Sequence, residues 1–243
     1  MTTTSAPAPA GGDDQRTGRV AGLWYLGLAL TGMASFIVIR PMVFDPDDAA
    51  ATLANIRSDE WLAYLGLGLE IGIVLTQALA AVWFYKLLRP LGEVAAWAVA
   101  VFGMVNAVAI MGSSVMVGTA LEVAGDASLA PAADAAATVQ LLVAASMHFW
   151  GVGALFFGLW LIPMGWVAVR SGRFPSVLGW ILVAGGVGYC VSAFVAYGIA
   201  DAPEWLVSAL QTPASVGEFW MIGYLLVKGI RPAAGIGRAV PAA

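Results

Sequence analysis

Three ionisable side chains interrupt long apolar stretches of this chain: Glu70, His148 and Glu218. An ionisable group in hydrocarbon costs roughly 3 kcal/mol or more, so each of them is a candidate for function. Carboxyl groups inside a membrane serve proton-linked transport, and a carboxyl within hydrogen-bond reach of an imidazole can act with it as general acid and base. The residue types therefore indicate two kinds of chemistry, proton-linked ligand binding and acid–base catalysis.

Uncharged polar residues occur at related positions in the same apolar stretches. Gln77 follows Glu70 by one heptad and shares its helix face, Asn106 and Ser113 share a face of the next apolar segment, and Tyr189 adds a phenol further on. These groups could line a polar pocket with the ionisable residues. The alternative is that they hydrogen-bond between helices and set helix register, a role that is common for such residues. We favour this packing role for the amides and Ser113, and a functional role for the two glutamates.

The composition of the chain predicts that these residues lie within a membrane. The 243 residues are 60% hydrophobic and 11% charged, and the mean hydropathy is +0.86. Such a chain cannot solvate a soluble globule, and a net charge of -4 gives no basic surface for nucleic acid. One cysteine and one histidine exclude an intramolecular disulfide and a multi-histidine metal site, so we expect neither a metal nor a cofactor.

The apolar segments predict an all-α polytopic bundle of six transmembrane helices, because about 20 apolar residues are needed to cross the bilayer. The predicted spans are Val20 to Ile39, Leu62 to Leu88, Val94 to Leu121, Leu141 to Val169, Val177 to Ile199 and Leu206 to Val227. Pro163 is expected to kink the fourth span. Ala184, Gly188, Ser192 and Ala196 form a stripe of small residues on the fifth span that would let a neighbouring helix approach closely.

Outside the spans, the sequence predicts little folded structure. Residues 1–18 are rich in Thr, Ala, Pro and Gly and are expected to be a disordered tail, residues 19–232 form the six-helix domain, and residues 233–243 form a second short tail. A short surface helix is predicted over Asp47 to Ile56, with Asp47 or Asp48 as its N-cap.

Loop charges predict the orientation, because cytoplasmic loops carry the excess of Lys and Arg. Arg40 and Arg57 fall on one side of the predicted bundle. The other nine basic residues fall on the opposite side: Arg16, Arg19, Lys86, Arg89, Arg170, Arg173, Lys228, Arg231 and Arg238. Both termini are therefore expected in the cytoplasm.

Helix rise places the ionisable residues at different depths. Glu218 lies ten residues before Lys228, hence about 15 Å from the cytoplasmic boundary and near the midplane, where the neutral acid is favoured. Glu70 lies about 24 Å from Lys86, in the outer leaflet, and His148 lies near the outer boundary. A pocket shared by all three would open to the non-cytoplasmic face.

Several stretches resemble a bacterial membrane family catalogued as domain of unknown function 4386. The resemblance covers most of the chain and rests on Arg19-Val-Ala-Gly-Leu-Trp-Tyr25, Asp48-Ala-Ala-Ala-Thr-Leu-Ala-Asn-Ile56, Leu88-Arg89-Pro90, His148, Phe156-Phe-Gly-Leu159, Arg170-Ser-Gly172, Gly217-Glu218 and Lys228-Gly229. Glu70 stands where the family pattern has Asp, which keeps the carboxyl and lengthens its reach. The resemblance implies a six-helix protein of the bacterial inner membrane and supplies no established activity.

Three classes of function fit these residues. The first is binding or transport of a small or amphipathic, lipid-like ligand in an outward-opening pocket that includes Glu70, His148, Glu218, Gln77, Asn106 and Tyr189; a homo-oligomer could supply a larger scaffold. The second is a membrane enzyme that uses Glu70 and His148 for acid–base chemistry on a lipid-soluble substrate. The third is a non-catalytic partner in a membrane assembly. We rank them in this order.

Overall fold

The computed structural model describes residues 12–231, and every regular element in that range is helical. The elements are α1 (Gly12–Met33), the π-helix η1 (Ala34–Ile39), α2 (Arg40–Val43), α3 (Ala49–Ser58), α4 (Glu60–Leu88), α5 (Glu93–Gly125), the short turns η2 (Ala127–Leu129) and η3 (Pro131–Ala133), α6 (Ala135–Ser171), α7 (Ser176–Gly198) and α8 (Glu204–Val227). The predicted all-α class is confirmed.

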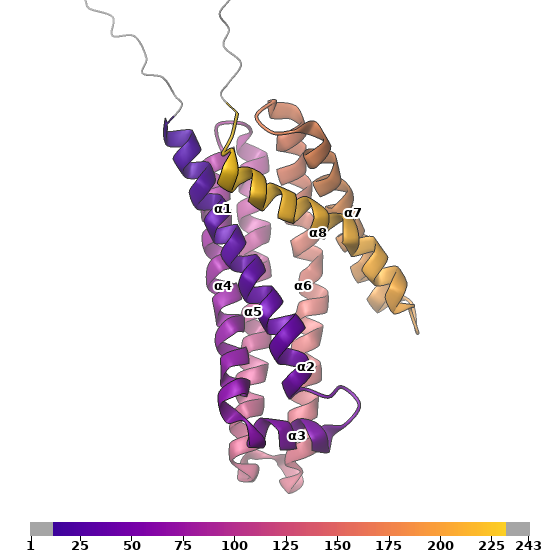
Figure 1. Ribbon diagram of the computed structural model, residues 1–243. Coiled ribbons are helices and arrows are strands. Elements are labelled where there is room, and N and C mark those ends of the chain that lie inside the picture. The colour runs from indigo at the N-terminus through magenta and orange to yellow at the C-terminus, as the bar shows by residue number, and fades with distance from the viewer. Residues whose placement is uncertain (1–11, 232–243) are drawn as a thin grey trace, which may run out of the picture.

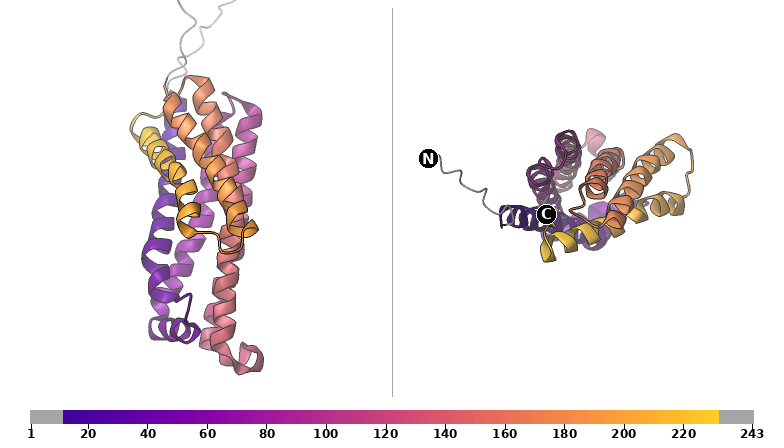
Figure 2. Two further views of the ribbon diagram at one scale, coloured as in Figure 1. Left: turned by 90° about the vertical axis from the view of Figure 1, so that its right-hand side faces the viewer. Right: turned by 90° about the horizontal axis from the view of Figure 1, so that it is seen from above.

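Three long helices, α4, α5 and α6, form the upright frame of the molecule (Figure 1). Helix α1 packs on α4, and α7 packs on α6. Helix α8 crosses obliquely from the end of α7 to α1, so it connects the two outer helices across the face of the bundle (Figures 1 and 2). Helix α3 lies across the opposite end of the bundle from the start of α1 (Figure 1).

Five helical segments are long and apolar enough to cross a membrane: Gly12–Val43, Glu60–Leu88, Glu93–Gly125, Ala135–Ser171 and Ser176–Gly198. The chain is therefore a multi-pass membrane protein in contact with lipid. The sixth predicted span forms a helix, α8, but does not join this set. Its middle holds Gln211, Thr212, Pro213, Ser215 and Glu218, and these polar residues lower its hydropathy.

Part of the segment predicted as an N-terminal tail is helical. Helix α1 begins at Gly12, so the last part of the expected tail, residues 12–18, is helical; residues 1–11 and 232–243 lie outside the described range. Two contacts hold this helical turn in place. The Asp14 carboxylate pairs with Arg173 at 2.7 Å, and the Gln15 amide donates to the Ile230 carbonyl at 2.6 Å. The acidic first turn also suits a helix N-terminus.

The predicted surface helix is confirmed as α3, and the Asp48 side chain accepts a hydrogen bond from the Ala51 N–H as its N-cap. Helix α6 is continuous from Ala135 to Ser171 and contains Pro163, and the kink predicted there stays a prediction.

The predicted stripe of small residues on α7 is only partly at a helix interface. Gly188 and Ser192 are buried against α8, whereas Ala184 and Ala196 are exposed. A spacing of four residues drifts by about 40° per step around an α-helix, so four such positions do not share one face. The contact with α8 instead includes Gly185, which approaches Ala214.

Candidate functional site

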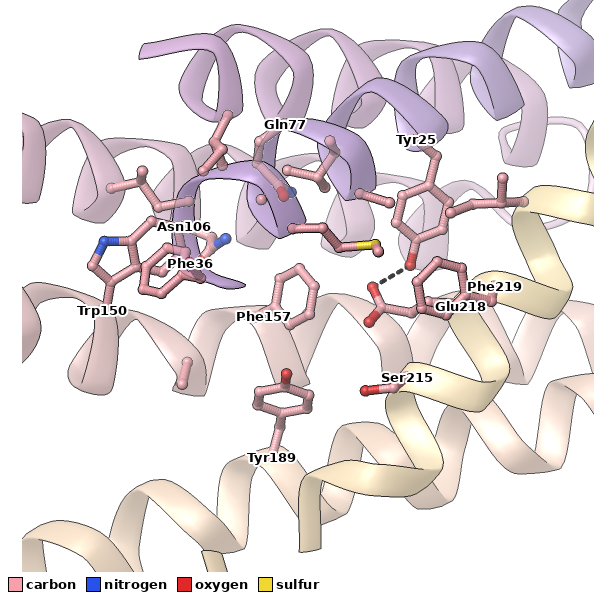
Figure 3. Close-up of a pocket in the computed structure, with 18 residues that line it drawn as sticks. Tyr25, Phe36, Gln77, Asn106, Trp150, Phe157, Tyr189, Ser215, Glu218 and Phe219 are labelled. Carbon is pink, nitrogen blue, oxygen red and sulfur yellow. Dashed lines mark hydrogen bonds between the residues drawn. The ribbon is translucent and has the colours of Figure 1, made fainter. Parts of the chain in front are cut away.

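A cavity of about 290 Å³ lies between α1, α8 and the frame helices (Figure 3). It extends along α1 and η1 from Tyr25 to Phe36. Its polar lining residues come from six different elements: Tyr25, Gln77, Asn106, Trp150, Tyr189, Ser215 and Glu218. Four of the six site residues predicted from the sequence, Gln77, Asn106, Tyr189 and Glu218, therefore lie around one space.

The carboxyl of Glu218 is held by Tyr25. The phenol of Tyr25 donates a hydrogen bond of 2.5 Å to Glu218 Oε1, which joins α1 to α8 (Figure 3). The Tyr25 ring is 1% exposed, and it packs edge-to-face against Phe84 and Trp160, each at 5.4 Å between ring centroids. Because the aromatic contacts fix the phenol, the carboxyl at this end of the cavity has one defined orientation.

Two residues that line the cavity, Gln77 and Trp150, have buried polar atoms that lack partners among the residues that the structure describes. Gln77 is 0% exposed, and neither its amide nitrogen nor its oxygen has a hydrogen-bond partner among residues 12–231. The indole N–H of Trp150 also lacks a partner in the described chain. Buried polar groups are nearly always hydrogen-bonded, and leaving one unpaired costs about 1–3 kcal/mol. Within the same range, Trp160 Nε1 and Gln140 Oε1 lack partners in the same way although neither residue lines the cavity, so these atoms do not by themselves indicate a ligand.

Glu70 does not line this cavity, contrary to the sequence prediction of a shared pocket. It is 2% exposed and accepts a hydrogen bond of 2.7 Å from Arg40. Ser113 and Ser114 lie at 3.2 and 3.4 Å from its second oxygen. Arg40 also donates to Ser146 at 2.7 Å. Glu70 is thus the acceptor of a buried ion pair that joins α2, α4, α5 and α6.

Arg40 is a residue that the sequence prediction placed in an outer loop. It follows the π-helix η1, which adds about one residue per turn compared with an α-helix. The extra residue turns Arg40 by about 100° from the direction that continuous α-helix geometry would give it. Its guanidinium lies between the rings of Phe36 and Phe44, at 5.3 and 5.4 Å from their centroids.

His148 lies apart from both carboxyls. It is exposed on α6, and its Nδ1 is 3.2 Å from the hydroxyl of Tyr197 on α7. It borders a shallow, mainly apolar groove between α5 and α6. The predicted pocket of Glu70, His148 and Glu218 is therefore wrong. Glu70 turns toward Arg40, Glu218 toward Tyr25, and His148 toward Tyr197.

Two further residues that line the cavity, Tyr25 and Trp150, were not predicted from the sequence as site residues. Tyr25 belongs to the Arg19 to Tyr25 motif, which marked its position but not its role. Trp150 is one of ten tryptophans, so its residue type alone does not single it out. Within residues 12–231, no cluster of three or more His, Cys, Asp or Glu side chains could hold a metal ion.

One family model matches the chain, and it covers the helical bundle. The family is described as "Domain of unknown function (DUF4386)", and the match extends over residues 20–229. Comparison with curated proteins and with solved structures gives no match. The matched range contains every residue that lines the cavity and the whole Arg40–Glu70 cluster. The chain therefore belongs to the DUF4386 family of membrane proteins, whose function is not established.

Proposed function

We propose that this protein binds a small or amphipathic, lipid-like ligand in the cavity between α1 and α8. The observation that carries the proposal is a cavity of about 290 Å³ inside the bundle, lined by aromatic rings and by the carboxyl of Glu218, which Tyr25 holds by a hydrogen bond. A helix interface that served only for packing would be filled by side chains, with few voids larger than a water molecule.

The composition of the cavity supports an amphipathic ligand. Aromatic rings of Phe36, Trp150 and Phe157 form much of the wall, and a few polar groups lie at defined places between them (Figure 3). This arrangement is typical of small-molecule sites, where apolar walls contribute burial and a few polar atoms fix orientation.

We propose entry from the bilayer between α1 and α8, in place of the outward opening expected from the sequence. Met33 on α1 is 43% exposed and Phe219 on α8 is 54% exposed, and both line the cavity. Apolar rim residues that face lipid suit a ligand already dissolved in the membrane. Glu218 places an ionisable carboxyl on the cavity wall. Carboxyls inside a membrane serve proton-linked transport, so we extend the proposal to transport of the ligand coupled to protons.

The side-chain geometry does not support an enzyme that uses Glu70 and His148 together as acid and base. General acid–base catalysis needs both groups within reach of one substrate. Here Glu70 is buried in an ion pair and His148 is exposed on another part of α6, with Tyr197 as its neighbour. Ligand binding is therefore the function that the side-chain geometry favours.

A cavity-filling variant tests the proposal. Ala154 on α6 lines the cavity, whereas Ala144 on the same helix is exposed and does not. We expect Ala154→Leu to lower the bound fraction of the ligand that copurifies in mild detergent by about ten-fold, equivalent to 1.4 kcal/mol, with Ala144→Leu unchanged. Native mass spectrometry measures the bound fraction, and thermal unfolding verifies that both variants fold. Equal occupancy in the two variants would refute ligand binding in this cavity.

A further inference from the structure

We infer that the ligand is an amphipathic organic cation, whose head takes the place of the proton on the Glu218 carboxyl and whose apolar tail extends toward the bilayer. This assignment rests on the proposed function and names the class of molecule that the same cavity takes. Three features of the lining carry it: a carboxyl without a basic neighbour, a carboxyl oxygen that is open to the cavity, and a wall of aromatic rings.

The lining of the cavity is acidic. Among the described residues that form it, none is Arg, Lys or His, and Glu218 is the one acidic side chain. The guanidinium of Arg40 donates to Glu70 and Ser146 and is engaged there. An anionic head would therefore be buried beside a carboxyl without a counterion, which is costly, whereas a cationic head supplies the positive charge that the lining lacks.

The carboxyl of Glu218 is open to a ligand on one side. Its Oε1 accepts the hydrogen bond of 2.5 Å from the Tyr25 phenol, and its other oxygen points away from Tyr25 (Figure 3). The Glu218 side chain is partly exposed and lines the cavity, in contrast to Gln77, which is 0% exposed. One oxygen can therefore contact a cation while Tyr25 holds the other in place.

Aromatic rings from four helices line the cavity together with this carboxyl (Figure 3): Tyr25 on α1, Phe157 on α6, Tyr189 on α7 and Phe219 on α8. The face of an aromatic ring attracts a cation within about 6 Å of its centroid, and rings of this kind recognise quaternary ammonium groups. A volume of about 290 Å³ suits a compact head. The lining thus combines a carboxyl with ring faces, the two kinds of group that bind an organic cation.

A cation and a proton compete for the Glu218 carboxyl. Without a cation, an isolated charge inside the bundle is costly, so the carboxyl keeps its proton. When the cation enters, the O–H bond of the carboxyl breaks, the proton leaves to water, and the carboxylate pairs with the cation without a covalent bond. Binding therefore releases a proton, and it must strengthen as the pH rises, because fewer protons then compete for the same oxygen.

The proton exchange belongs to Glu218 because the other titratable groups around it are phenols. Tyr25 on α1 and Tyr189 on α7 face the cavity from the two helices that pack on α8. In the part of the chain that the structure describes, α4, α5 and α6 contribute no titratable side chain to the lining.

Three probes with the same tail length and different head charge test the inference on the purified protein in an uncharged detergent. Decyltrimethylammonium is a permanent cation, 1-decanol is neutral, and decyl sulfate is an anion. Isothermal titration calorimetry measures the Kd of each. We expect the cation to bind and the other two to bind at least about ten-fold more weakly. The affinity for the cation should rise by up to about ten-fold per unit of pH, with proton release visible to a pH indicator.

A matched pair of substitutions on α8 relates this preference to the carboxyl. Glu218→Gln keeps the size of the side chain and an acceptor for Tyr25 but removes the exchangeable proton and the charge. It should weaken decyltrimethylammonium binding by about ten-fold and abolish both the proton release and the pH dependence. Glu204→Gln makes the same change at an exposed position in the first turn of α8, outside the cavity, and should alter none of these. Thermal unfolding verifies that both variants fold, and the probe series on the unaltered protein tests the inference even without them.

The outcomes separate the two proposals. Failure of decyltrimethylammonium to bind, tighter binding of 1-decanol or decyl sulfate, an affinity that does not change with pH, or proton release that persists in Glu218→Gln would each overturn the inferred ligand class. Ligand binding itself would still stand as long as Ala154→Leu displaces the copurified molecule and Ala144→Leu does not.

Discussion

At the scale of single residues, two carboxyl groups of the same apolar bundle have different partners. Glu70 faces a guanidinium and two serine hydroxyls, which satisfy a charged carboxylate. Glu218 faces a phenol that donates a single hydrogen bond, at the edge of a cavity. The first environment is that of a structural ion pair, and the second leaves a carboxyl oxygen available to a ligand. We therefore propose that Glu70 stabilises the fold and that Glu218 contacts the ligand.

The Arg40–Glu70 pair gives the first prediction. Removing one partner from a buried ion pair leaves an uncompensated charge, so Arg40→Leu should lower the free energy of unfolding by about 3–5 kcal/mol. The double variant Arg40→Leu/Glu70→Leu should recover most of this loss, because no isolated charge remains. Unfolding in detergent by titration with sodium dodecyl sulfate measures both. If the double variant were as unstable as Arg40→Leu, the loss of stability would not come from the unpaired charge of Glu70.

The Tyr25–Glu218 hydrogen bond gives the second prediction. An amide oxygen can accept the phenol O–H as a carboxyl does, so Glu218→Gln should fold normally, within about 0.5 kcal/mol of the original protein. Tyr25→Phe removes the donor and leaves the carboxyl buried without it, so it should cost about 1–3 kcal/mol. The same titration compares them. If Glu218→Gln failed to insert or to fold, an ionised structural role for Glu218 would be the better account.

At the scale of elements, two local features position the site. The π-helix η1 turns Arg40 inward and places Phe36 between the ion pair and the cavity. The small residues of α7 let α8 approach closely enough to bring Glu218 to Tyr25. A Cβ at Gly185 would collide with the backbone of Ala214, and one at Gly188 with the carbonyl of Leu210. The cavity wall therefore depends on close approaches of the backbone at these glycines.

A matched pair of substitutions on α7 tests this dependence. Gly188→Val should lower the free energy of unfolding by about 1–3 kcal/mol, since α8 must move away to admit the side chain. Ala184→Val, at an exposed position on the same helix, should change it by less than about 0.5 kcal/mol. Thermal unfolding in detergent reports both values. Similar stability for the two variants would mean that the α7–α8 contact is looser than described.

At the scale of the whole molecule, the frame helices are longer than a membrane requires. Helix α6 has 37 residues, hence a length of about 55 Å, against a hydrocarbon core of about 30 Å. Helix α7 has 23 residues, so the hairpin of α7 and α8 leaves part of the frame uncovered (Figure 2). We propose that the ends of α4, α5 and α6 next to α3 project from the membrane on the predicted non-cytoplasmic side.

Cysteine accessibility tests this arrangement and the sixth crossing. With Cys190 replaced by Ser, single cysteines at Asp47, Asp126 and Asp201 should react with an impermeant reagent in intact cells, and those at Arg89 and Arg173 should not, because only cytoplasmic loops carry the basic excess. Labelling at Asp201 with protection at Lys228 would support a crossing by α8. Labelling at Arg173 in sealed cells would refute the orientation.

The sequence by itself determined the elements of this protein. Helix bounds, the capping of α3 by Asp48 and the apolar length of five spans depend on neighbouring residues along the chain. Most bounds were predicted within about four residues, whereas α1 begins at Gly12 and not Val20, and α6 begins at Ala135 and not Leu141. Four residues of the cavity, Gln77, Asn106, Tyr189 and Glu218, were found because polar groups in apolar segments stand out by composition alone.

Only the tertiary structure decided which of these groups meet. Tyr25 and Glu218 are 193 positions apart, and their contact follows from the oblique path of α8 across α1. Arg40 reaches Glu70 because a π-helix changes the direction of its side chain. Glu70 and His148 both belong to the outer half of the predicted bundle yet face different neighbours. The rotation of each helix about its axis depends on packing against distant segments, and that information is absent from local sequence patterns.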